Sequence, residues 1–245
     1  MPAEPAKIFG FEVVFDQPHA VRNREEFDRL SPTWHETVTK FHQLMYASEI
    51  WSGVRWRGAP VGKLPTDLWI YQELIYEIQP DLIVETGSAM GGSAAFFASL
   101  LDLNQRGQIV SIDNVAAERS QHPRVSYWHG SSTDPAIVDR LRPLVSRAKS
   151  VMVTLDSAHS TEHVGRELAL YSPLVTVGSY IVVEDGNVDG NPVLPGYVDA
   201  YDGQPGGPQA AIHAFLASTD EFEIDIRRHK FALTLNPNGY LRRVK

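Results

Sequence analysis

Short apolar runs alternate with longer segments of helical periodicity across the middle of the chain. Five runs of apolar and β-branched residues predict strands near residues 82–85, 108–112, 124–128, 151–155 and 179–183. Apolar residues at helical spacing predict helices near residues 66–78, 92–103, 134–147 and 161–171. Because strands that alternate with helices usually form parallel sheets, this pattern predicts an α/β fold.

Both ends of the chain depart from this alternation. The first 60 residues contain several prolines and an amphipathic stretch from Pro32 to Ser48, which predicts a helical arm or cap over residues 1–60. The main domain is then expected over residues 61–245. The tail predicts antiparallel strands that close one edge of the sheet, at Phe222–Arg228, Phe231–Thr234 and Tyr240–Val244.

A long segment rich in glycine and proline, Gly186–Pro208, lies between the fifth predicted strand and the tail. Loops of this length in compact domains usually have a function, often as a lid over a ligand. We therefore expect a lid here, and an unstructured segment is the competing interpretation.

Composition and charge exclude several functions. The formal net charge is −8 and is spread without long charged runs, which argues against nucleic acid as a partner. The absence of cysteine excludes a disulfide framework, a thiolate metal site and a thiol nucleophile. No apolar stretch reaches membrane-spanning length, and the first residues lack the pattern of a secretory signal. The sequence predicts a cytoplasmic enzyme without a membrane partner.

The first predicted strand ends in a glycine-rich turn that favours one cofactor. Dinucleotide sites normally carry Gly-x-Gly-x-x-Gly so that the backbone can approach a pyrophosphate, whereas the run from Glu85 to Gly91 reads Glu-x-Gly-x-x-x-Gly. S-adenosylmethionine (SAM) has no phosphates, and its sulfonium and ammonium favour a nearby carboxylate. The second strand ends at Asp113, where a carboxylate can bind both ribose hydroxyls. The turn predicts SAM, with NAD as the weaker alternative.

Three more acids follow the fourth and fifth predicted strands: Asp156, Glu184 and Asp185. Ligands bind at the carboxyl ends of parallel strands, so we expect these acids to converge near the cofactor. Oxygen ligands without cysteine select Mg²⁺, Mn²⁺ or Ca²⁺ over zinc. His159 is close enough to Asp156 to act as a general base on a hydroxyl that the metal polarises. The competing interpretation is that some of these acids only cap helices or turns.

Several segments in this order resemble the rhamnosyl O-methyltransferase and cephalosporin-hydroxylase family. The resemblance extends from about Trp51 to the C-terminus. It rests on the segments Lys63–Trp69, Tyr71–Ile75, Glu85–Gly87, Gly91–Ala94, Gly130–Ser132, Leu155–Ser160 and Glu184–Asp185.

The resemblance implies a class I SAM-dependent methyltransferase with a Rossmann-like, seven-stranded, mostly parallel sheet and an antiparallel C-terminal strand. It also implies a divalent metal, Mg²⁺ or Mn²⁺, and a deoxysugar hydroxyl of a natural product as acceptor. The metal ligands would be Asp156, Glu184 and Asp185, and the base His159, or Asp156 where relatives lack this histidine. The cofactor residues that it implies are Tyr71, Gln72, Glu85, Thr86, Gly87, Gly91, Ser93, Asp113 and Ser131.

The expected partner is a small glycosylated or sugar-nucleotide acceptor. We also expect a homo-oligomer, because an arm such as residues 1–60 can exchange between subunits. Two other functions compete with this interpretation. One is a hydroxylase or oxidoreductase component of antibiotic tailoring, and the other is a non-catalytic SAM-binding partner.

Overall fold

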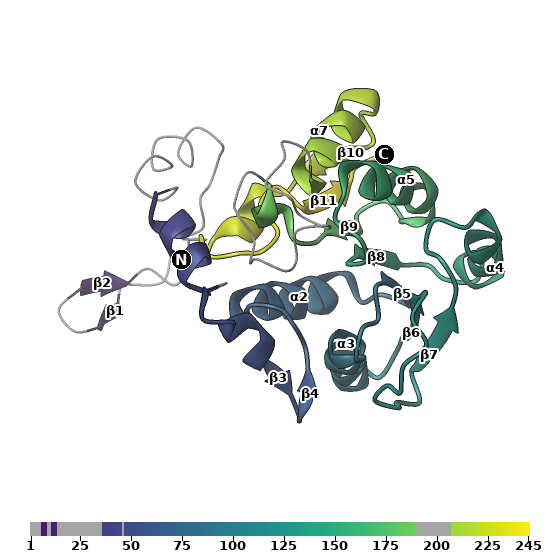
Figure 1. Cartoon of the computed structure of the whole chain (residues 1–245), viewed down its shortest axis with the longest axis horizontal. Helices are drawn as coiled ribbons and strands as arrows, with labels where there is room; N and C mark the ends of the chain where they lie inside the picture. The colour runs from purple at the N-terminus through teal and green to yellow at the C-terminus, as the bar shows by residue number, and fades with distance from the viewer. Residues whose placement is uncertain (1–5, 9–10, 14–35, 46, 190–206) are drawn as a thin grey trace.

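The computed structural model describes residues 6–8, 11–13, 36–45, 47–189 and 207–245, and one seven-stranded sheet forms its centre (Figure 1). Five neighbouring strands pair in parallel, and β11 runs antiparallel to both of its neighbours. The sheet is therefore mostly parallel with an antiparallel C-terminal strand, as the resemblance implies. In spatial order the strands are β10 (Phe222–Ile224), β11 (Tyr240–Arg243), β9 (Tyr180–Val183), β8 (Val151–Leu155), β5 (Leu82–Thr86), β6 (Gln108–Asp113) and β7 (Val125–His129).

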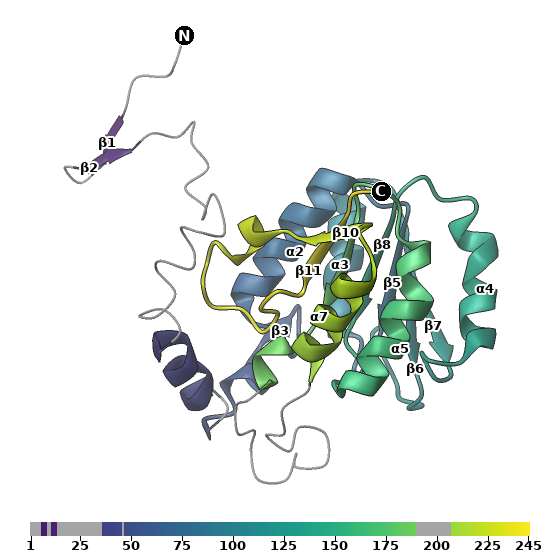
Figure 2. The same cartoon turned by 90° about the horizontal axis from the view of Figure 1, so that it is seen from above.

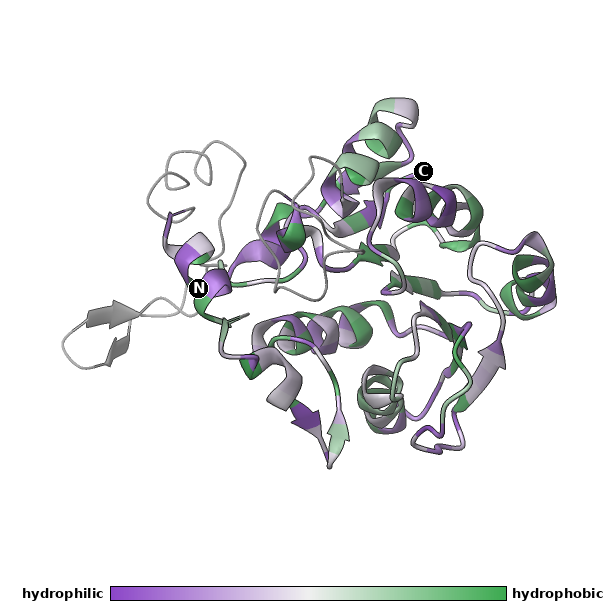
Figure 3. Cartoon of the chain, in the orientation of Figure 1, coloured by the Kyte–Doolittle hydropathy of each residue, from purple (hydrophilic) through white to green (hydrophobic). Residues whose placement is uncertain are grey.

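Helices cover both faces of this sheet (Figure 2). Ile83 of β5 packs with residues of α2 and α3, whereas its neighbours Leu82 and Val84 pack with residues of α4 and α5. The central strands are buried on both faces, which explains their nearly continuous apolar sequence (Figure 3). The helices are α2 (Pro65–Ile78), α3 (Gly92–Leu103), α4 (Pro135–Val145), α5 (Thr161–Tyr171) and α7 (Pro208–Ser218).

Local signals explain where α4 and α5 begin. The Asp134 side chain accepts a hydrogen bond from the Ala136 amide at 2.9 Å and so caps α4. Ser160 caps α5 in the same way, accepting from the His163 amide at 3.2 Å. This second cap matters for the site, because it fixes the turn that carries the residues between Asp156 and Ser160.

The tail differs from the sequence prediction in its middle part. β10 ends at Ile224, because the Asp225 side chain accepts from the Arg227 amide and starts the 3-10 helix η4 (Ile226–His229). The structure describes all of Phe231–Thr234, and these residues form no strand. The Thr234 hydroxyl instead donates to the buried carboxylate of Asp67 in α2. The prediction is therefore wrong for the second segment and right for β11.

The predicted long loop is shorter than Gly186–Pro208. Its first residues form the 3-10 helix η3 (Gly186–Val188), and Pro208 is already the first residue of α7, a helix that sequence analysis did not predict. Residues 190–206 lie outside the described residues, and the lid prediction falls on them.

The N-terminal region contains small elements that precede the main sheet. β1 (Ala6–Ile8) pairs with β2 (Phe11–Val13), and a helix covers residues 36–45 within the predicted Pro32–Ser48, whose first four residues lie outside the described part. Met45 of this helix packs with Leu64 and Leu235. The 3-10 helix η1 (Ile50–Gly53) leads to a hairpin of β3 (Arg55–Trp56) and β4 (Ala59–Pro60), which packs on α3.

Candidate functional site

Gly87 brings the ends of β5 and β8 into close contact. The Asp156 amide donates to the carbonyl oxygen of Thr86 at 3.0 Å and also lies 3.3 Å from its hydroxyl. A Cβ atom on Gly87, whose φ is +82°, would lie only 1.7 Å from the carbonyl oxygen of Asp156. Glycine is therefore required by both backbone conformation and space. The consequence is that Asp156 sits directly beside the predicted cofactor turn.

The Glu85 carboxylate is fully buried beneath this turn. It accepts hydrogen bonds from the hydroxyls of Ser93, in the first turn of α3, and Ser111, in β6. Burial raises the pKa of Glu85 to about 7, although both hydroxyls oppose the shift. Ser111 also lies 2.6 Å from the hydroxyl of Ser88 in the turn. Glu85 thus ties the turn, α3 and β6 together.

Asp113 stands at the end of β6 on the rim of a pocket of about 260 Å³. Its carboxylate accepts from the amides of Ala89 at 2.9 Å and Val115 at 2.8 Å, and Arg119 lies 3.4 Å away. These contacts hold an acid where the sequence predicts a ribose. The pocket is lined by Gly87, Ala89, Asp113, Asn114, Ser131, Ser132, Asp156, Ser157, Ala158 and His163.

The lining of this pocket also includes a polar cluster that sequence analysis did not predict as part of the site. His163 Nε2 lies 2.9 Å from the hydroxyl of Ser157 and 3.2 Å from that of Ser132. Ser157 also donates to the buried Glu167 carboxylate at 2.8 Å. The cluster gives this part of the pocket several hydrogen-bonding groups, and the Glu167 carboxylate lies 3.5 Å from His163 Nε2.

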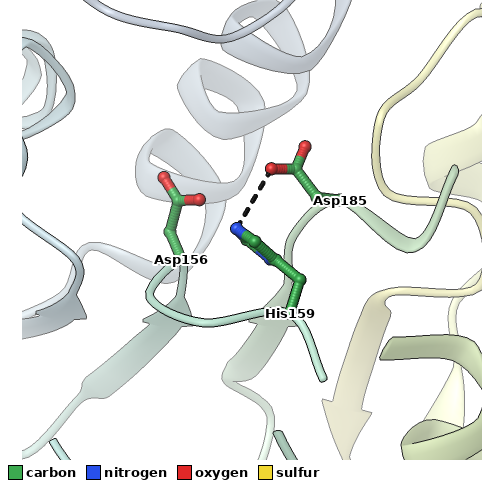
Figure 4. Close-up of side chains that lie close together, drawn as sticks. All are labelled: Asp156, His159 and Asp185. Carbon is green, nitrogen blue, oxygen red and sulfur yellow. Dashed lines mark ion pairs between the residues drawn. The ribbon is translucent and has the colours of Figure 1, made fainter. Parts of the chain in front are cut away.

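Asp156, His159 and Asp185 converge at the ends of β8 and β9 (Figure 4). His159 Nε2 lies 3.3 Å from Asp185 Oδ2, and one ligand atom from each of the three residues lies within 4.8 Å of the others. Burial raises the pKa of Asp156, raises that of Asp185 to about 7, and lowers that of His159. This spacing and these donor atoms fit a single divalent cation.

Glu184, the third predicted metal ligand, has different neighbours in this structure. Its carboxylate is buried, accepts from the hydroxyl of Tyr71, and lies 2.9 Å from Nζ of Lys63. Lys63 Nζ also donates to Asp156 Oδ2 at 2.7 Å. In the described part of the chain, Glu184 is thus a neighbour of the Asp156–His159–Asp185 group and not a member of it. Sequence analysis assigned no role to Lys63, because a single sequence does not reveal that a lysine is buried.

The structure brings only part of the predicted cofactor set to the pocket. Gly87, Asp113 and Ser131 line it. Tyr71 does not line the pocket, because it packs against Phe97 in the core. Its hydroxyl donates to the Glu184 carboxylate and lies 2.7 Å from the Thr154 hydroxyl. The other predicted cofactor residues are also outside the lining that the structure describes: Gln72, Glu85, Thr86, Gly91 and Ser93.

A second, larger pocket of about 560 Å³ lies beside the β3–β4 hairpin and the outer face of α3. Its described lining includes Trp56, Asp102 and His122, and none of the predicted site residues. The smaller pocket is the better candidate site, because it holds Asp113 and Asp156 together and adjoins the Asp156–His159–Asp185 group.

This sheet order, with a glycine turn after β5 and acids after β6, β8 and β9, defines the Rossmann-like fold of SAM-dependent methyltransferases. Two solved structures of CmcI share the fold. The apo-structure superposes with a TM-score of 0.60 at 23% identity, covering 79% of this chain and 77% of that chain. The structure with Mg and SAM superposes with a TM-score of 0.58 at 20% identity, covering 79% and 78%.

The chain belongs to the rhamnosyl O-methyltransferase/CmcI family, whose family model matches residues 48–244. It is 36% identical over 213 residues to the rhamnosyl O-methyltransferase of Mycobacterium tuberculosis H37Rv, covering 82% of this chain and 83% of that protein. It is 35% identical over 209 residues to that of Mycobacterium leprae, covering 82% and 88%. The chain is accordingly a SAM-dependent O-methyltransferase. Among the helices that the structure describes, none is long and apolar enough to cross a membrane.

Proposed function

We propose that this enzyme transfers the methyl group of SAM to a hydroxyl of a rhamnose-like deoxysugar, carried by a small natural product or an activated sugar. One observation carries the proposal: Asp113 and Asp156 face a single pocket beside the Asp156–His159–Asp185 group. The names of the mycobacterial relatives support the sugar acceptor. The polar wall of Ser132, Ser157 and His163 supports a nucleoside in the pocket, because these side chains can form hydrogen bonds with it.

Asp113 would bind the ribose, because its oxygens are already oriented by the amides of Ala89 and Val115. Ser131 would form the wall on the adenine side of the same pocket. Glu85 would act on the amino-acid end of SAM through the turn that it fixes, since its own oxygens accept from Ser93 and Ser111. Tyr71 and Gln72 would act at most indirectly, Tyr71 through its hydrogen bond to Glu184.

SAM supplies an electrophilic methyl group, and a divalent cation would lower the pKa of the acceptor hydroxyl. His159 would take the proton from that hydroxyl, because burial lowers the pKa of its imidazole and so favours the neutral form that can accept a proton. Asp185, at 3.3 Å from Nε2, orients the ring and stabilises the imidazolium that forms. His159 is buried, which limits the access of water to this proton transfer.

We propose Mg²⁺ as the cation, with Mn²⁺ as an alternative, and Asp156 and Asp185 as ligands. CmcI has been solved with Mg and SAM, which supports a metal in this family. Glu184 could join them only by leaving its contacts with Tyr71 and Lys63. If His159 binds the ion, it cannot serve as base, and Asp156 is then the candidate base. A Mg²⁺ titration of His159→Gln separates the two roles, because loss of a ligand raises the metal concentration needed for half the maximal rate, whereas loss of a base lowers the maximal rate itself.

Calorimetric titration of SAM, with and without Mg²⁺, followed by mass analysis of a pooled set of deoxysugar glycosides, tests the function. We expect SAM binding in both conditions and a gain of one methyl mass that requires the metal. SAM binding without any methylated acceptor would favour a non-catalytic SAM-binding partner. Failure to bind SAM would contradict the whole assignment of the pocket.

The division at residue 60 and a homo-oligomeric state remain proposals. The exposed side chains of Leu44 and Ile50, in and just after the helix over residues 36–45, support an arm with a further contact surface. We expect light scattering on a sizing column to give a mass above one chain, and removal of residues 1–47 to reduce it. A monomeric mass for the full chain would contradict the exchange of an arm.

A further inference from the structure

Lys63 places a positive charge inside the group of acids at the ends of β8 and β9. Its side chain is 2% exposed, and Nζ lies 2.7 Å from Asp156 Oδ2 and 2.9 Å from Glu184 Oε1. Nζ also lies 5.7 Å from the centre of the Tyr71 ring. A buried ammonium is costly unless it is paired, so the two carboxylates and Lys63 depend on one another.

The position of Lys63 before α2 is fixed by the surrounding fold. Leu64, the next residue, packs with Met45 and Leu235, and Pro65 starts α2. These contacts hold the backbone of Lys63 beside the acids. Tyr71, two turns into α2, donates to the same Glu184 oxygen that faces Lys63. Two residues of one segment thus hold Glu184 in place.

The charges of the three carboxylates, Lys63 and one divalent cation would add up to zero. The acid centre, meaning the carboxylates of Asp156, Glu184 and Asp185, carries three negative charges when it is ionised. Lys63 compensates one of them, and the remainder equals the charge of one divalent cation. The Asp156–His159–Asp185 spacing independently fits such an ion.

We propose that Lys63 is a built-in counter-cation of the acid centre, a positioning residue that sets the affinity of the centre for a divalent cation and holds Asp156 and Glu184 when no cation is bound. This inference rests on the proposed function, because it concerns the same cation site. Lys63 repels an incoming cation across a short, poorly screened distance and so weakens its binding. Lys63 also reduces the repulsion between the carboxylates, so that they can stay close together when no metal is bound.

Mn²⁺ binding in the absence of SAM and acceptor tests this role, measured by paramagnetic resonance of the free ion. The variants are Lys63→Met, which keeps the length of the side chain, and Lys63→Met/Glu184→Gln, which removes one charge of each sign. Lys40→Met is the matched control, because Lys40 pairs with Glu36 at 2.5 Å on an exposed helix surface. Thermal unfolding of each protein in EDTA and in excess Mn²⁺ gives a second readout.

We expect Lys63→Met to bind Mn²⁺ about tenfold more tightly than the wild type. It should also melt at a lower temperature in EDTA and gain more from Mn²⁺ than the wild type. The double variant should return both properties towards the wild type, and Lys40→Met should change neither. If Lys63→Met does not fold, the double variant still tests the idea, because the proposal predicts that it folds and binds Mn²⁺ no more tightly than the wild type.

Unchanged or weaker Mn²⁺ binding by Lys63→Met, including no binding by either protein, would overturn the proposal. A double variant that binds Mn²⁺ as tightly as Lys63→Met would overturn it as well, because the charge of Glu184 would then not be one that Lys63 compensates. SAM binding by the wild type is measured separately. A failure of the Lys63 proposal can therefore be told apart from a failure of the methyltransferase assignment.

Discussion

At the end of β5 the buried Glu85 carboxylate is surrounded by the hydroxyls of Ser93 and Ser111, whereas at the ends of β8 and β9 the acids meet a lysine and a histidine. In the first region, neutral hydroxyl groups satisfy the hydrogen bonds of the acid. These contacts fix the position of the turn and leave no free carboxylate oxygen facing an ion. The second region keeps several charges within a few ångströms and compensates them only in part. The comparison supports the proposal that one half of the site positions the cofactor and the other half binds a cation and moves a proton.

Asp156 belongs to both halves, so Asp156→Asn should give the largest effect. The variant should lose metal-stimulated methyl transfer, with a rate reduced roughly 10³-fold, because a Lewis acid supplies several kcal/mol of stabilisation. SAM affinity should change much less, since the backbone contacts of Asp156 with Thr86 remain. Rates with Mg²⁺ and with EDTA, together with a SAM titration, check this. Metal stimulation that survives in the variant would remove Asp156 from the ligand set.

His159→Gln should lower the rate about 10²-fold, because a positioned base typically contributes that much or more. Gln keeps a polar side chain beside Asp185 but cannot accept the proton. The SAM dissociation constant should stay within about twofold, since His159 is not in the described lining of the pocket. Steady-state rates and calorimetry on the same preparation measure both. An unchanged rate would exclude His159 from the reaction.

Gly87→Ala should disrupt the junction between the two halves. Its Cβ would lie 1.7 Å from the carbonyl oxygen of Asp156, so we expect a loss of roughly 1–3 kcal/mol in the free energy of unfolding and weaker SAM binding. Gly165→Ala in α5 is the control, since a Cβ atom added there would meet no atom within 4 Å and alanine favours helices by up to about 1 kcal/mol. Urea unfolding of both variants checks the contrast. Equal stability of the two variants would contradict the close approach.

Glu85 should make folding stability depend on pH. Its pKa is raised to about 7 in the folded protein, above the ordinary value of 4.5, so between these values the folded state binds more protons than the unfolded state. The free energy of unfolding should therefore fall as pH rises through this range, by roughly 3 kcal/mol from Glu85. Glu85→Gln should show a smaller fall between pH 5 and pH 8 in urea titrations. An identical fall would mean that Glu85 is not the source.

The central sheet could be predicted from sequence because its strands are buried on both faces and appear as continuous apolar runs. The tail could not be predicted fully. Residues 231–233 are apolar and so resemble a strand, but the segment is held outside the sheet by the hydrogen bond from Thr234 to Asp67, which is far away in the chain. α7 was missed, since it follows a segment of glycine and proline that gives no helical signal. Asp113 and Asp156 were placed correctly in one pocket, because strand ends meet at one sheet edge.

Burial and side-chain direction explain the remaining differences in the site. Glu184 and Asp185 are neighbours in sequence, but Glu184 faces Lys63 and Tyr71 while Asp185 faces His159. A sequence shows only that both acids follow β9. Lys63 lies 93 residues before Asp156, and only the folded chain shows that the two side chains meet.

Transfer of an isotopically labelled methyl group from SAM to a rhamnosyl glycoside, in EDTA and after addition of Mg²⁺, tests most directly whether the two halves act together. We predict SAM binding in both conditions and labelled product only after Mg²⁺ is added. Equal transfer in EDTA and Mg²⁺ would contradict the role of the cation at Asp156 and Asp185.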